Sequence, residues 1–96
     1  MKVIIPLASK ENKIQEIKEQ WKCTQITGCG QITFALVNID YCTNWSIVEY
    51  KTGRVILHDI GKLSKQRFER LSKLIINMNP QRIKNAIENN EIINEA

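Results

Sequence analysis

The feature that most constrains the fold is a nearly continuous apolar run from Ile32 to Ile39, with the sequence ITFALVNI. Its length and its β-branched and aromatic content favour a β-strand. A strand with one solvent-exposed face would alternate apolar and polar residues, and this run does not alternate. It therefore predicts a central strand with both faces at least partly covered.

The neighbouring segments supply partners for this strand. Residues 23–27 precede a glycine-bearing loop, Gly28-Cys29-Gly30, which predicts a hairpin with the central run. Residues 44–58 contain two further strands joined by Thr52-Gly53, where glycine supplies the positive φ of a tight turn. A short apolar segment at 2–6, ended by proline, predicts a first strand.

Three segments predict helices. Ser9 can cap a first helix with an apolar stripe at Ile14, Ile17 and Trp21, and Asn79-Pro80 starts a short last helix. The clearest helix follows Ser64, and its apolar side comprises Leu63, Phe68, Leu71, Leu74, Ile75 and Met78.

The order of elements is thus β-α-β-β-β-β-α-α, which predicts an α+β fold with helices packed on a small antiparallel sheet. We expect one domain, residues 1–96, because the length suits a single thin core. A homodimer would enlarge that core. No apolar run in the sequence approaches the length of a membrane span, so we expect no membrane partner.

The charge distribution favours an acidic partner. The net charge is +4, and residues 51–84 carry nine Lys or Arg residues against Asp59 and Glu69. Such a concentration is typical of surfaces that contact phosphates. The predicted binding residues are Lys51, Arg54, Lys62, Lys65, Arg70 and Lys73, with Trp45 near a turn as an aromatic anchor.

A catalytic alternative centres on Asp40, Glu49 and Lys51. If the strands pair so that residue numbers sum to 89, Asp40 lies opposite Glu49, and Lys51 shares their face. Two carboxylates at that separation can hold Mg²⁺, and a lysine can assist attack by water. We favour the simpler interpretation, in which these residues form the solvated face of a hairpin and no metal or other cofactor is bound.

Two resemblances extend these hypotheses. Asp40, a spacer and then Glu49-x-Lys51, within residues 31–74, resembles the PD-(D/E)xK nuclease superfamily, which implies metal-dependent phosphodiester hydrolysis, with Glu16 or Glu19 as a further acid. The opening of the long helix, GKLSK, is similar to that of double-stranded-RNA-binding domains. That resemblance implies phosphate contacts by Lys62 and Lys65.

The cysteines give weaker hypotheses. Cys29 at a loop tip, with His58 as base, would be a nucleophile. Cys23, Cys29, Cys42 and His58 would form a zinc site, although their spacing fits no common zinc motif. Three cysteines without a secretory signal favour reduced thiols in a cytoplasm.

We therefore expect a small basic, non-catalytic protein that binds nucleic acid or a nucleoprotein complex, such as a regulator or inhibitor from a phage or mobile element. The alternatives are the metal-dependent nuclease and a protein-only interactor that inhibits a host complex. An exposed apolar patch around Trp45 would favour the protein-only alternative.

Overall fold

The computed structural model describes residues 1–6, 12–28, 30–38, 45–58, 60–89 and 91–94. Among these residues, no helix is long and apolar enough to cross a membrane. The elements are β1 (Lys2–Pro6), β2 (Asn12–Glu16), β3 (Glu19–Thr27), β4 (Gly30–Asn38), β5 (Trp45–Glu49), β6 (Val55–Leu57), α1 (Lys65–Met78) and α2 (Pro80–Glu88).

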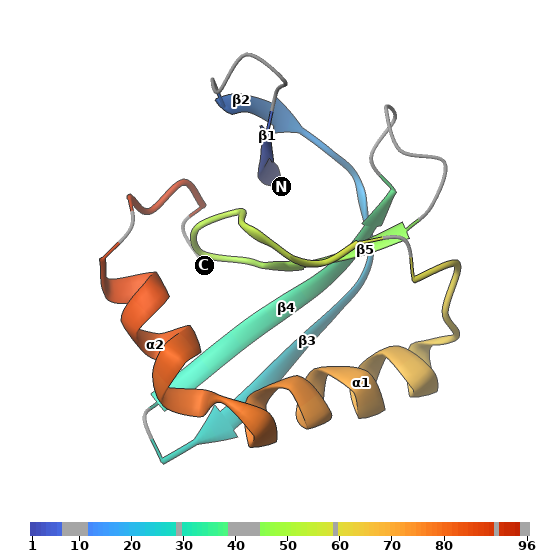
Figure 1. The fold of residues 1–96 in the computed structure, drawn as a ribbon. Helices are drawn as coiled ribbons and strands as arrows, with labels where there is room; N and C mark the ends of the chain where they lie inside the picture. Colours follow the sequence, from blue (N-terminus) through green and yellow to red (C-terminus); the bar gives the residue numbers. More distant parts are fainter. Residues whose placement is uncertain (7–11, 29, 39–44, 59, 90, 95–96) are drawn as a thin grey trace.

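The elements form three layers, and the middle layer is a four-stranded antiparallel sheet of order β3-β4-β5-β6 (Figure 1). The separate β1–β2 hairpin contributes Val3 and Ile5 to a core on one face of this sheet. Helix α1 contributes Phe68 and Ile76 to a core on the other face. The α+β class is therefore confirmed, with the helices on one side of the sheet.

Strand β4 is the covered central strand that its apolar run predicts. Phe34 and Leu36 point to the α1 side, whereas Ala35 and Val37 point to the β1–β2 side. All four side chains are fully buried. Because successive residues point into cores on opposite faces of the sheet, apolar residues are needed at every position and the sequence does not alternate between apolar and polar residues.

The helix predicted to follow Ser9 is wrong over the part that the structure describes. Residues 12–16 form β2, and β3 begins at Glu19. Burial along β3 alternates residue by residue, and β3 pairs with β4 over most of its length. The backbone hydrogen bonds that β3 forms along the edge of β4 outweigh the weak local preference of this segment for helix. The other seven elements follow in the predicted order.

Helix α1 begins and ends where its sequence predicts. The Ser64 hydroxyl accepts a hydrogen bond from the Arg67 N–H at 3.3 Å, and Asn79 separates α1 from α2, which begins with proline. The buried residues of α1 are Phe68, Ser72 and Ile76. The predicted apolar side is therefore only partly covered by the sheet.

Candidate binding surfaces

The strand register separates the residues of the nuclease hypothesis. Glu49 pairs with Phe34, and Asn38 pairs with Trp45, so the numbers sum to 83 and not to 89. This register sets Ile47 against Leu36, which joins two fully buried side chains across the strands. The predicted pairing of Asp40 with Glu49 is therefore wrong, and Asp40 itself lies outside the described residues.

Glu49 is a structural carboxylate of the turn between β5 and β6. One oxygen accepts the Lys51 N–H at 2.8 Å, and the other accepts the Thr52 N–H at 2.8 Å and the Thr52 hydroxyl at 2.7 Å. The side chain is buried, with 3% of its surface exposed. Both oxygens are therefore committed to the turn, which removes Glu49 from the exposed face that the sequence predicted.

The same turn holds β1 and the C-terminal segment. Gly53, at φ +68°, accepts a hydrogen bond from the Ile4 N–H, and the Lys51 carbonyl accepts hydrogen bonds from the N–H groups of Ile93 and Asn94. The Asn94 side chain bonds both backbone polar groups of Lys2 at 2.8 Å. The turn is thus a junction of the fold, and Lys51 takes part in it through its backbone.

The predicted basic residues fall into two groups. Lys51 and Arg54 are exposed at the β5–β6 turn. The others lie on α1 or immediately before it, and all are exposed: Lys62, Lys65, Arg70 and Lys73. The ammonium of Lys65 lies 6.0 Å from the centre of the Trp21 ring on β3, at the opposite edge of the sheet from β6.

The second group lies in a strongly basic part of the chain. Residues 62–88 carry seven basic side chains against Glu69 and Glu88. Within the described chain, the ion pairs are Met1–Glu16 and Lys84–Glu88, so the α1 cations have no carboxylate partner. This outer face of α1, formed by Lys62, Lys65, Arg70 and Lys73, is named the cationic face below.

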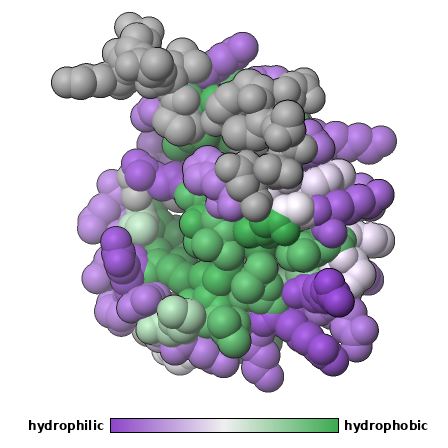
Figure 2. Space-filling model, turned by 45° about the vertical axis from the view of Figure 1, so that its right-hand side comes forward, coloured by the Kyte–Doolittle hydropathy of each residue, from purple (hydrophilic) through white to green (hydrophobic). Residues whose placement is uncertain are grey.

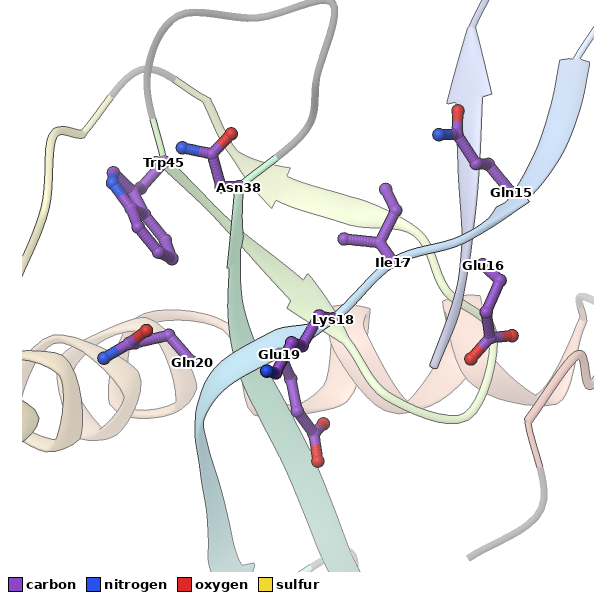
Figure 3. A pocket seen from close by; sticks show the side chains of 8 residues that line it. All are labelled: Gln15, Glu16, Ile17, Lys18, Glu19, Gln20, Asn38 and Trp45. Atoms are coloured by element: carbon purple, nitrogen blue, oxygen red, sulfur yellow. The ribbon is translucent and has the colours of Figure 1, made fainter.

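Trp45 is not the exposed anchor that its place near a turn suggested. It is half-buried, packs against the core on the α1 side, and its carbonyl accepts the Ile60 N–H at 3.1 Å. Its ring borders a shallow polar depression of about 450 Å³, with Asn38 and Gln20 beside it and Gln15 farther away on β2 (Figure 3).

A larger depression of about 530 Å³ lies between β6, α1 and α2. Ten of its fifteen lining residues are apolar. Hydrophobic side chains gather around a hollow on one face of the molecule, and hydrophilic side chains surround them (Figure 2). This apolar groove is walled by Ile56, Leu57, Leu71, Leu74, Met78 and Ile83.

The sequence pointed to only part of this groove. Leu74 and Met78 were assigned to a covered helix side, but 57% and 68% of their surfaces are exposed. Arg82 was not singled out, although it lines the groove together with Arg54. The useful sign was the width of the α1 apolar side, which exceeds what one sheet face can cover.

The cysteine hypotheses receive no geometric support. Cys23 is half-buried on β3, and its sulfur accepts a hydrogen bond from the Gln25 amide at 3.2 Å. Cys29 and Cys42 lie outside the described residues. Within the described ranges, no three His, Cys, Asp or Glu residues gather where they could hold a metal ion.

Comparisons with protein-family models, curated proteins and solved structures give no match. Function is therefore inferred from the cationic face and the apolar groove themselves.

Proposed function

We propose that this protein is a non-catalytic binding protein whose cationic face contacts the phosphates of a nucleic acid, alone or within a nucleoprotein complex. The observation that carries this proposal is the excess of unpaired cations on one exposed helix. Helix α1 carries four basic side chains and one acidic one, Glu69, and this excess favours an anionic partner over a neutral one.

The arrangement of cations on α1 suits contacts along the sugar-phosphate backbone of a nucleic acid. Arg70 and Lys73 are three residues apart, so they project from neighbouring positions of the helix. Arginine can donate two parallel hydrogen bonds to a phosphate, and lysine acts as a point charge. Because such contacts read no base edges, we expect weak sequence preference and strong dependence on salt.

Catalysis has less support than binding. The carboxylate that the nuclease hypothesis required, Glu49, is buried and bonded to three donors of its own turn. A metal ligand needs free oxygen lone pairs directed at a common point. The protein-only alternative is favoured by a different observation, the apolar groove.

The test is a fluorescence anisotropy titration of labelled single- and double-stranded DNA and RNA. The variant Arg70→Glu/Lys73→Glu changes two exposed residues without disturbing the Lys65–Trp21 contact. We expect it to weaken binding by at least about tenfold and to lower the slope of log affinity against log salt by about 2.

The matched control is Lys2→Glu/Lys13→Glu. It makes the same change in net charge on the β1–β2 hairpin, which contributes to the core on the opposite face of the sheet. It should retain most of the affinity. Equal losses in the two variants would show only a general charge effect, and absence of binding to all four nucleic acids would refute the proposal.

A further inference from the structure

The apolar groove exists because α1 carries more apolar surface than the sheet can cover. Phe68 and Ile76 are buried against the sheet, whereas Leu71 and Ile75 are only half-buried. Successive positions around the helix then lead to the exposed side chains of Leu74 and Met78, four residues apart. This strip turns away from the sheet and faces the groove.

The other walls are incomplete in the same way. Helix α2 has no buried residue, and Ile83 and Ile87 are only half-buried where they line the groove. Strand β6 is an edge strand of three residues, and Ile56 and Leu57 are half-buried there. Three elements with incompletely buried apolar side chains thus converge on a concavity without filling it.

The polar border of the groove is cationic. Arg54 lines it beside β6, and Arg82 lines it on α2. In the part of the chain that the structure describes, neither guanidinium has an ion-pair partner. Glu49 also lines the groove, but its two oxygens accept hydrogen bonds from the turn. An occupant therefore meets apolar walls and two uncompensated positive charges.

From this combination we propose that the groove is a docking site for an acidic amphipathic α-helix of a partner protein. The groove-facing strip of α1 from Leu71 to Met78 is about 10 Å long, or two helical turns. A partner helix with apolar residues at i, i+3 or i+4 and i+7 covers a strip of that length. Asp or Glu residues beside its apolar stripe would pair with Arg54 and Arg82.

Other occupants fit these features less well. A second copy related by two-fold symmetry would set the same cationic border against itself, and like charges in contact disfavour association. An added strand has little to pair with, because β6 is only three residues long. A short amphiphile carries one anionic group, whereas an acidic helix can present a carboxylate to each of the two arginines, Arg54 and Arg82.

The experiment selects peptides of about 16 residues from a random phage-displayed library, long enough for about four helical turns. The wild-type protein is the bait, and Leu74→Asp/Met78→Asp serves for counter-selection. Both positions are exposed, so the counter-selection variant should fold. Circular dichroism and thermal melting check that it does.

Enriched peptides are then synthesised, labelled with fluorescein and titrated by anisotropy. We expect acidic peptides with apolar residues at helical spacing that gain helicity on binding. Leu74→Asp/Met78→Asp and Arg54→Glu/Arg82→Glu should each weaken binding by at least about tenfold. Arg70→Glu/Lys73→Glu, which makes the same charge change on the cationic face, should weaken it by less than about threefold.

Three results would overturn the proposal. The first is failure of any peptide to enrich over the counter-selected variant, and the second is enrichment of peptides without acidic residues or helical spacing. The third is saturable binding of dodecanoate that is lost in Leu74→Asp/Met78→Asp and displaces every selected peptide, which would identify a site for small amphiphiles. None of these results depends on nucleic-acid binding, so the two proposals fail or stand separately.

Discussion

The two glycine-bearing turns of the main sheet differ in what surrounds them. The turn between β3 and β4 includes Gly28 and Gly30, and a Cβ added at either glycine would meet nothing within 4 Å. The turn between β5 and β6 includes Gly53, where an added Cβ would lie 2.5 Å from the Lys2 carbonyl oxygen. We call these the open turn and the packed turn.

The difference shows which part of the molecule sets its stability. A Cβ has room at both glycines of the open turn, and the neighbouring Ile26 is 82% exposed. The packed turn, in contrast, joins β5, β6, β1 and the C-terminal segment through hydrogen bonds at Glu49, Gly53 and Lys51. Equivalent substitutions should therefore be far more destabilising in the packed turn.

The largest effect is expected for Gly53→Ala. The positive φ costs an alanine about 1 kcal/mol, and the contact of 2.5 Å with a backbone oxygen forces β1 away from the turn. We expect a loss of about 4 kcal/mol in the free energy of unfolding, measured by urea denaturation followed by circular dichroism. A loss below about 1 kcal/mol would mean that β1 is not held against this turn.

Glu49→Ala should have the next largest effect. It leaves the Thr52 N–H and hydroxyl and the Lys51 N–H without their acceptor in a buried site. Loss of hydrogen bonds to a buried carboxylate costs about 3 kcal/mol, which corresponds to a fall in Tm of roughly 15 °C for a domain of this size. Calorimetry checks this value.

Glu49→Gln is the matched variant for the charge itself. Its amide keeps one acceptor oxygen but places an NH₂ group against one of the donors. It should lie between wild type and Glu49→Ala in stability. If both variants were as stable as wild type, the carboxylate would not support the packed turn.

Asn94→Ala tests the C-terminal arm of the packed turn. The Asn94 amide bonds the Lys2 N–H and carbonyl and the Tyr50 carbonyl, and the residue is 8% exposed. We expect a loss of about 2 kcal/mol. Hydrogen exchange should show faster exchange at Ile4 and Ile93, while amides of β4 stay protected.

The sequence correctly predicted those features that depend on the residues of a single element. The apolar run of β4 permits only a strand covered on both faces, and Ser64 and Pro80 set helix starts through local hydrogen bonds and a fixed φ. The segment from Ile14 to Trp21 was ambiguous, because its apolar spacing fits a helix. Pairing with β4 made Trp21 part of a strand, and that partner is distant in sequence.

The candidate sites were less predictable, because they depend on register and on what remains uncovered. Asp40 and Glu49 could be placed opposite each other only by assuming a turn, whereas burial of Ile47 against Leu36 decides the register. The groove depends on which apolar residues of α1 the sheet fails to reach. The width of the α1 apolar side indicates that part of it stays uncovered, but it does not indicate that Leu74 and Met78 are the exposed residues.

The smallest effects are expected at the open turn. Gly30→Ala keeps free space around the new methyl group, so its cost is the positive φ of +114° alone, about 1 kcal/mol. Gly28→Ala and Ile26→Thr should change the free energy of unfolding by less than about 0.5 kcal/mol. Urea denaturation of these variants beside Gly53→Ala gives the comparison directly. If Gly30→Ala were as destabilising as Gly53→Ala, the cost of glycine replacement in this protein would lie in backbone conformation and not in the packing of the turn.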